Sequence, residues 1–140
     1  MSKTPRELAI DILARRDHSI REMRKKLQKK NITSELINET IAWLIDKRLL
    51  NDREFAQKKA ESIMRTKMCG PRYIEYKLRE AGIASDIIDD VLGKSASDHE
   101  WQQRAKKALV QWKKIHPKHT EDRIRQQRFL ASRGFDRIHI

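Results

Sequence analysis

Residues 19–37 read SIREMRKKLQKKNITSELI, and residues 70–88 read GPRYIEYKLREAGIASDII. A shift of 51 positions superimposes the two stretches and pairs their apolar residues: Met23 with Ile74, Leu27 with Leu78, and Ile37 with Ile88. Within each stretch the apolar residues recur at spacings of three and four, which predicts amphipathic helices that each bury one face. A short turn separates the two predicted helices. The stretches therefore predict a helix-turn-helix unit that occurs twice.

A third copy of the unit lies near the end of the chain. A further shift of 52 positions places Leu130 on Leu78, Gly134 on Gly82, and Phe135 on Ile83. Self-similarity at a fixed period is typical of repeat proteins, in which each unit packs on its neighbours. We therefore predict an all-α fold of tandem three-helix, helix-turn-helix-like repeats that form an elongated, curved molecule.

The predicted repeats occupy residues 1–50, 51–97 and 98–140. Only residues 136–140 follow Phe135, about one helical turn. The third repeat is therefore expected to be incomplete, with its last helix largely missing, either because the protein is naturally short or because it has been truncated. Gln126 lies where the repeat has an apolar residue, so a loosely packed core is expected in this unit.

Proline, glycine and capping residues set the expected helix limits. Pro5 and Pro71 suit first helical positions, where a missing N–H costs nothing. A capping side chain precedes a glutamate by three residues at Thr4, Ser19 and Asn51. We expect left-handed helix ends at the glycines: Gly70, Gly82, Gly93 and Gly134. The resulting helices cover residues 4–16, 19–30, 34–47, 51–66, 71–81, 85–92, 98–115 and 120–133.

One apolar stripe on each helix is expected to form the core. In the first three helices the stripes are Leu8, Ile12 and Leu13, then Ile20, Met23 and Leu27, then Ile37, Ile41, Leu44 and Ile45. With four glycines and three prolines in 140 residues, the composition favours long helices, and we expect no sheet.

The charge of the chain points to an acidic partner. The formal net charge is +12, far more than solubility requires. Residues 1–50 carry +5, residues 51–97 carry +1 and residues 98–140 carry +6. Both ends are therefore basic, as expected for a protein that binds nucleic acid or an acidic protein surface. Apolar runs do not exceed about five residues, so no membrane span is expected and the protein is predicted to be cytoplasmic.

Motifs of catalysis are absent from the sequence. It has no glycine-rich phosphate loop, no HExxH and no GxSxG. The single cysteine, Cys69, can form neither an internal disulfide nor a cysteine-rich zinc site. His116 and His119 lie in a basic loop without a carboxylate or thiol partner, which makes a poor metal site. We expect a non-enzymatic protein that uses no cofactor.

Basic residues are the remaining candidates for function. Arg21, Lys25 and Lys29 recur every four residues, with Arg24 beside them, which predicts a cationic ridge opposite Met23 and Leu27. The full candidate set for partner or DNA binding is Arg16, Arg21, Arg24, Lys25, Lys29, Arg65, Arg72, Lys113, Lys114, Arg123, Arg125, Arg128 and Arg133. Trp101, Trp112 and Phe129 are interleaved with the last of these as candidate stacking surfaces. The alternative for any single residue is that the lysine only solvates a helix and the tryptophan is core.

The chain resembles the RecX family, regulators of the bacterial RecA recombinase, over essentially its whole length. The resemblance rests on these residues in this order: Arg16-Asp17-His18-Ser19, Met23, Leu27, Leu50, Asp52, Phe55, Arg65, Gly70-Pro71-Arg72-Tyr73-Ile74, Leu78, Gly82-Ile83, Arg128-Phe129-Leu130 and Arg133-Gly134-Phe135. Each motif alone is weak, but their order and spacing coincide with the repeat.

The resemblance implies a modulator that docks in the groove of the RecA–single-stranded-DNA filament and limits its growth. It would thereby lower ATP hydrolysis, strand exchange and co-protease activity. The implied partners are the RecA filament and single-stranded DNA, with weaker binding to double-stranded DNA, and the implied state is a monomer. Two alternatives stay open: a stand-alone nucleic-acid-binding module, and an adaptor for a protein partner without nucleic acid.

Overall fold

The computed structural model describes residues 3–136 of the chain. This part of the protein holds eight α-helices and one short 3₁₀ helix, with no β-strand. The elements are α1 (Pro5–Arg15), α2 (Ile20–Lys29), α3 (Ser34–Asp46), α4 (Asp52–Thr66), α5 (Pro71–Glu80), α6 (Ser85–Ser95), α7 (Asp98–Ile115), η1 (Pro117–His119) and α8 (Arg123–Ser132). The all-α prediction is confirmed, and each expected helix is present with ends within three residues of those predicted.

Side-chain caps fix the starts of the helices. The Ser19 hydroxyl accepts the backbone N–H of Glu22 at 3.1 Å, and the Glu22 carboxylate accepts the backbone N–H of Ser19 at 3.1 Å, a complete capping box. Thr4 and Asn51 cap α1 and α4 through their side-chain oxygens. Because these bonds satisfy amides that have no partner within the helix, the starts are set locally.

A left-handed residue follows the second helix of each repeat. Asn31 has φ 59°, and its equivalents Gly82 and Gly134 have φ 81° and 88°. The left-handed prediction is thus confirmed for these two glycines. It is wrong for Gly70, which precedes α5 with φ −99°, and for Gly93, which lies inside α6.

Three groups of buried side chains form the core. The first is Ala9, Met23, Leu27, Ile37, Ile41, Leu44 and Leu50. The second contains Phe55, Ile63, Ile74, Leu78, Ile83, Ile88 and Val91 together with Trp101 of α7. The third is Ala105, Ala108, Leu130 and Phe135, with Met68 packed against it. Trp101, from the predicted third repeat, packs in the core of the second, and Met68, from the second, packs against the core of the third. The repeat boundaries after residues 50 and 97 stay a prediction.

One expected core residue, Ile45, is exposed, and one candidate stacking residue, Trp101, belongs to the core instead. Ile45 is 45% exposed, and Thr40 is buried on α3, where its hydroxyl donates to the Leu36 carbonyl at 2.7 Å. Trp101 is only 3% exposed, so it offers no stacking surface. Both errors arise because helical spacing gives a face but not the width of the buried strip.

Gln126 is not a packing defect. Its side chain is 9% exposed, and its Nε2 donates to the Thr120 carbonyl at 2.8 Å and to the His119 carbonyl at 3.4 Å. A buried amide with such partners is accommodated rather than destabilising, and it ties α8 to the loop after α7. The predicted absence of a last helix falls mainly on residues 137–140, which lie outside the described residues.

The second repeat docks on the start of α2. The Ser19 hydroxyl donates to the carbonyl of Ala81 at 2.5 Å. The neighbouring Gly82 lies against Arg21, where a Cβ on the glycine would approach the Arg21 Cδ to 2.2 Å. The turn between α5 and α6 therefore fits against the first turn of α2 only because residue 82 is glycine.

The third repeat docks on the second in the equivalent place. The Gly70 N–H donates to the Arg133 carbonyl at 2.8 Å, and the Arg72 N–H donates to the Gly134 carbonyl at 3.0 Å. A Cβ on Gly70 would lie 2.5 Å from the Gly134 oxygen. The Arg72 guanidinium also holds the Asp136 carboxylate at 2.7 Å. Glycine is thus required at position 70 by a close backbone approach, not by a helix end.

The two junctions differ in a second contact, which involves the residue after Ser19 in one junction and the residue after Gly70 in the other. At the first, the Asp52 carboxylate at the start of α4 accepts the Ile20 N–H at 2.9 Å. At the second, the equivalent of Ile20 is Pro71, which has no N–H to donate. Arg104 of α7 makes the contact instead, by donating to three carbonyls that end α4 and lead to α5: Met64 at 3.2 Å, Lys67 at 2.8 Å and Cys69 at 3.3 Å.

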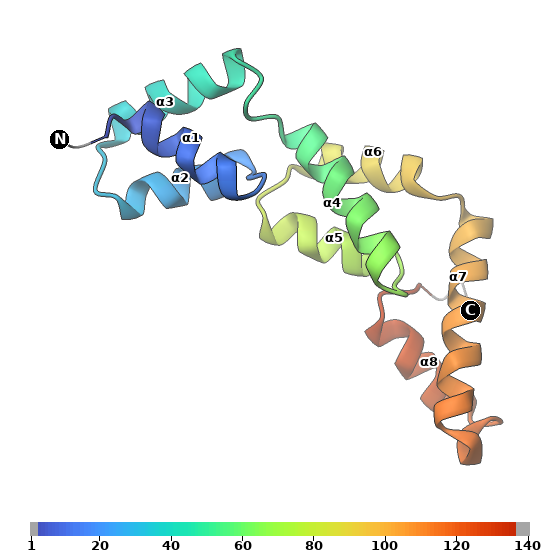
Figure 1. Cartoon of the computed structure of the whole chain (residues 1–140). Helices are drawn as coiled ribbons and strands as arrows, with labels where there is room; N and C mark the ends of the chain where they lie inside the picture. Colours follow the sequence, from blue (N-terminus) through green and yellow to red (C-terminus); the bar gives the residue numbers. More distant parts are fainter. Residues whose placement is uncertain (1–2, 137–140) are drawn as a thin grey trace.

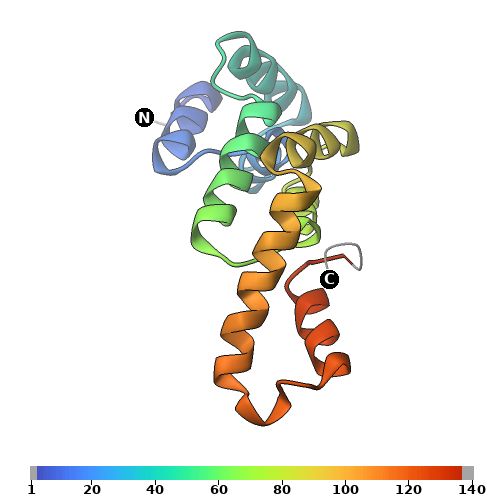
Figure 2. The same cartoon turned by 90° about the vertical axis from the view of Figure 1, so that its right-hand side faces the viewer.

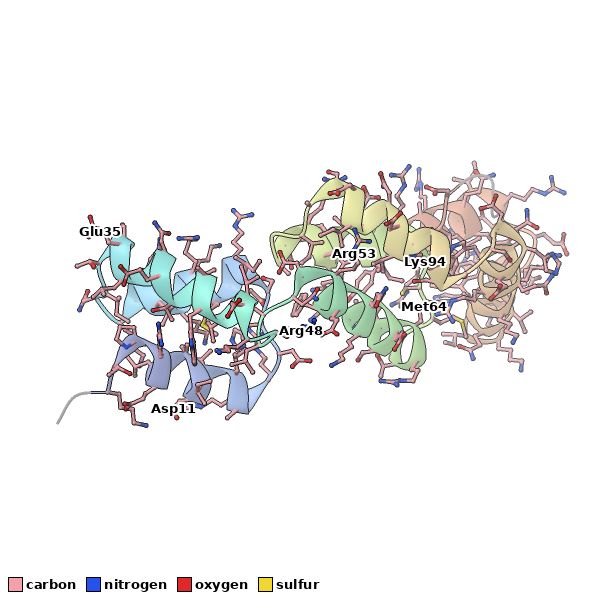
Figure 3. The ribbon with its side chains drawn as sticks, turned by 90° about the horizontal axis from the view of Figure 1, so that it is seen from above. Asp11, Glu35, Arg48, Arg53, Met64 and Lys94 are labelled. Atoms are coloured by element: carbon pink, nitrogen blue, oxygen red, sulfur yellow. The ribbon has the colours of Figure 1, made fainter. Side chains whose placement is uncertain are left out.

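These repeated contacts give an extended molecule. α1–α3 and the pair α7 and α8 lie at opposite ends, with α4–α6 between them (Figure 1). Turned by 90°, the view shows α7 and α8 side by side, projecting away from the other helices (Figure 2). Seen from above, α1–α3 form a group of their own that is joined to α4 just after Arg48 (Figure 3). The elongated repeat architecture is confirmed.

Candidate nucleic-acid interface

The basic candidates fall into two separate regions. One set lies on α2 or just before it: Arg16, Arg21, Arg24, Lys25 and Lys29. The other lies on α7 and α8 or directly after: Lys113, Lys114, Arg123, Arg125, Arg128 and Arg133. Arg65 and Arg72 lie on α4 and α5 between them. Because α2 and α8 are at opposite ends of the molecule (Figure 1), the candidates do not form one site.

The cationic ridge of α2 has one face buried and the other exposed. Met23 and Leu27 are fully buried in the first core, whereas Lys25 and Lys29 are exposed. Arg24 is half-buried and donates to the Asn38 side-chain oxygen at 2.7 Å, which fixes its guanidinium beside α3. The helix therefore presents its lysines to solvent on a rigid support.

Three of the candidates are engaged in ion pairs within the chain. Arg16 pairs with Glu22 at 3.1 Å, Arg125 pairs with Asp122 at 3.1 Å, and Arg72 pairs with two carboxylates. Arg21 packs on Gly82. These four residues have a role in the fold itself, at a capping box, a helix start or a repeat junction. Such exposed pairs contribute little stability, so a role in binding is compatible with them.

Other candidates have no carboxylate partner among the described residues. Within residues 3–136, no ion pair holds Lys25, Lys29, Arg65, Lys113, Lys114, Arg123 or Arg128. A cation without a neighbouring anion attracts phosphate or carboxylate without first breaking a contact. These seven are therefore the most available part of the predicted set.

A groove beside α1 and α2 was missed by the sequence analysis. It has a volume of about 340 Å³ and is lined by Leu8, Asp11, Ile12, Arg15, Arg16, His18, Lys26 and Lys30. Lys26 and Lys30 are one helical turn apart and lie on a different face of α2 from the ridge. Only the ridge was singled out from the sequence. The only carboxylate in the lining, Asp11, pairs with Lys3. The groove thus extends the positive surface of the first repeat.

His18 lines this groove and also a second hollow that is shared with Asn51 and Phe55 at the start of the second repeat. It is 4% exposed, its Nδ1 lies 2.9 Å from the Arg16 carbonyl, and its buried Nε2 has no hydrogen-bond partner among the described residues. Burial lowers the pKa of the His18 imidazole, and the nearby Arg16 lowers it further against an opposing effect of the Arg16 carbonyl. The ring is therefore neutral at physiological pH.

His116 and His119, at the end of α7 and in η1, are engaged in the fold. His116 stacks on Trp112 with ring centroids 4.5 Å apart, and its Nδ1 lies 3.0 Å from the Trp112 carbonyl. His119 lies 3.4 Å from Arg125. Among residues 3–136, no three His, Cys, Asp or Glu side chains are grouped as metal ligands, and no helix there is both long and apolar enough to cross a bilayer.

Comparison with known proteins matches the first two three-helix units to a known family. A family model described as the first three-helix domain of RecX matches residues 6–44, and one described as the second matches residues 51–92. The chain belongs to the RecX family. A regulatory protein RecX from Chlorobium phaeobacteroides is 32% identical over 93% of this chain and 84% of its own length. The family is therefore established both from the domain models and from a relative that is matched over most of its length.

A longer RecX relative and a solved RecX structure also resemble this chain. A regulatory protein RecX from Bacillus velezensis is 34% identical over 91% of this chain, and the matched part is 49% of that relative. The crystal structure of RecX from Lactobacillus salivarius superimposes with a TM-score of 0.87, covering 96% of this chain and 89% of that one at 24% identity. At this identity the likeness supports the fold of the RecX repeats.

Proposed function

We propose that this chain is a modulator of the RecA recombinase that binds in the groove of the RecA–single-stranded-DNA filament. By limiting filament growth it lowers ATP hydrolysis, strand exchange and co-protease activity. The observation that carries the proposal is membership of a family whose relatives are regulatory proteins RecX. The activity is one of binding rather than catalysis, in the cytoplasm and by a monomer.

The shape and charge of the molecule support this proposal. An extended row of repeats suits a long helical groove better than a compact surface would. Both ends carry lysines that form no ion pair within the described part of the chain: Lys25 and Lys29 on α2, and Lys113 and Lys114 at the end of α7. These lysines can meet acidic protein or DNA at two points on the filament. Two contacts on one rigid chain strengthen each other through effective concentration.

The test is the rate of single-stranded-DNA-dependent ATP hydrolysis by RecA. Added below the RecA concentration, the protein is expected to slow hydrolysis, because one molecule that stops growth affects many protomers. Unchanged hydrolysis at a stoichiometric excess of the protein would refute the proposal. Slowing that appears only at stoichiometric excess would refute the growth-limiting step specifically.

A second candidate function is a stand-alone nucleic-acid-binding module of helix-turn-helix type. The seven basic side chains without a carboxylate partner among residues 3–136 favour it, because such residues bind phosphates by releasing counterions. It predicts tight binding to DNA in the absence of RecA, with log affinity falling against log salt by about 0.7 for each phosphate contacted on a single strand. Micromolar or weaker binding at physiological salt would exclude it.

A further inference from the structure

A pocket lies at the junction of the second and third repeats. Its volume is about 560 Å³, within the range of roughly 300–1,000 Å³ typical of small-ligand sites. Its walls come from the end of α4, the start of α5, and α7 and α8, and they include Lys67, Tyr73, Trp112, His116, Phe129 and Arg133. We call it the junction pocket.

Aromatic rings dominate the walls of the junction pocket. Trp112 is the centre: it stacks on His116, and Phe129 tilts against it with ring centroids 5.9 Å apart and an interplanar angle of 31°. Tyr73 contributes a third ring from α5. All four side chains are half-buried, so part of each ring surface remains accessible. Rings held by their neighbours with accessible faces are suited to stacking by another planar group.

Cations stand at the rim beside these rings. The Lys67 ammonium lies 5.0 Å from the Tyr73 ring centre and 2.7 Å from the Tyr73 hydroxyl, and the Arg133 guanidinium lies 5.5 Å from the Phe129 ring centre. Both side chains are exposed. Among the described residues that line the pocket, Asp and Glu are absent, and the charged side chains are those of Lys67 and Arg133.

We propose that the junction pocket receives an unpaired base of single-stranded nucleic acid. The base stacks on Trp112 and Phe129, and the flanking phosphates lie against Lys67 and Arg133. Base–aromatic stacking combined with cations that follow the backbone is how sequence-independent single-strand binding is achieved. A duplex base keeps both faces covered by its neighbours, so the pocket discriminates single from double strands. The inference rests on the proposed function in that both have the chain meet single-stranded DNA.

The position of the pocket gives it a second property. The carbonyl of Arg133 is the acceptor for the Gly70 N–H that docks the third repeat, while the Arg133 side chain is at the pocket rim. Met68, from the loop that carries Gly70, joins the core of the third repeat. The pocket therefore exists only while the two repeats are docked, and a bound base stabilises that docking.

The test compares two short labelled strands of equal length on the wild-type full chain: oligothymidylate and an abasic phosphodiester. The two carry the same phosphates, so they differ only in bases. Stacking of one base predicts that oligothymidylate binds at least about five-fold more tightly and quenches tryptophan emission. Equal affinities would overturn the proposal and would leave an acidic protein segment as the occupant in place of a base.

Two tryptophan variants test whether the preference for oligothymidylate arises in the junction pocket. Trp112→Leu is expected to remove the preference for oligothymidylate, whereas Trp43→Leu is the matched control, since Trp43 lies in the first repeat beneath the Arg6 guanidinium. Loss of the preference in both variants would overturn the assignment to the junction pocket. If Trp112→Leu does not fold, equal affinities of the two strands for the wild-type chain would still overturn the proposal. Slowed RecA hydrolysis together with equal affinities would refute the pocket alone and leave the proposed function standing.

Discussion

Replacing Gly70 by alanine should undock the third repeat. The φ of −99° at this position is accessible to alanine, so the backbone conformation itself is not the obstacle. The obstacle is contact, because the added Cβ would lie 2.5 Å from the Gly134 oxygen and 2.7 Å from the Phe135 ring. The turn before Phe135 must therefore move away from α5.

The magnitude follows from what that movement breaks. Two backbone hydrogen bonds cross the junction, at 2.8 and 3.0 Å, and losing them lowers the free energy of unfolding by about 1–3 kcal/mol. If Phe135, which is 3% exposed, leaves its buried position, a further loss of about 1.5–3 kcal/mol is expected. Since the first repeat makes no part of this junction, its stability should not change.

The assay is urea unfolding followed by circular dichroism, with amide hydrogen exchange at Arg72 as the local readout. Gly93→Ala is the matched control: it lies in α6, a Cβ there meets nothing within 4 Å, and alanine should raise stability by about 0.5–1 kcal/mol. Faster exchange at Arg72 is expected only in Gly70→Ala. An unchanged urea midpoint and unchanged exchange in Gly70→Ala would refute this account of the junction.

Three further predictions concern the core, the pH response and the ridge. Leu78→Asp should unfold the second repeat, since a carboxylate without a partner in a fully buried site costs several kcal/mol; retained helicity by circular dichroism would contradict this. Burial lowers the pKa of His18, so the folded protein binds fewer protons than the unfolded one below the ordinary histidine value of about 6.5. The contribution of His18 to the free energy of unfolding is thus fully present above that pH, and it is lost as the pH falls toward the pKa of His18 in the folded protein. Charge reversal of the α2 ridge should weaken inhibition of RecA without loss of helicity, and the residues to reverse together are Arg24, Lys25 and Lys29.

Matched controls are available for the ridge prediction and for the His18 prediction. For the ridge, the matched variant reverses three exposed lysines that form no ion pair among residues 3–136: Lys47, Lys59 and Lys94. It changes the net charge equally and should keep inhibition; equal loss in both variants would mean that net charge alone matters. For His18, thermal midpoints from pH 5 to 8 are compared with His18→Asn, which should show a flatter response. A His18 pKa above 6.5 by NMR titration would contradict the prediction.

Local rules predicted most of the helices. The caps at Ser19 and Asn51, the prolines that open α1 and α5, and the left-handed turn at Gly82 all depend on residues within a few positions of one another. Those rules describe backbone groups that must be satisfied locally, so they can be read from one stretch of chain. The repeat was visible because the same local pattern recurs 51 residues later.

Features that depend on distant residues were not predictable in this way. The sequence assigned Gly70 to a helix end, whereas the structure explains it by a backbone 64 residues away at Gly134. The junction pocket combines residues 66–73 with α7 and α8, and the groove beside α1 combines two helices whose relative position no periodicity specifies. Helical spacing placed Trp101 and Trp112 alike, but only packing shows that the first is core and the second lines a pocket.

The central claim is that this member of the RecX family acts from within the RecA filament. The most direct measurement is a helical reconstruction of RecA–single-stranded-DNA filaments incubated with the protein. The account predicts density for the row of three-helix repeats lying along the filament groove, in contact with neighbouring protomers, and its loss with the Arg24, Lys25 and Lys29 charge-reversal variant. Bare grooves, with the protein found only at free DNA or in solution, would contradict it.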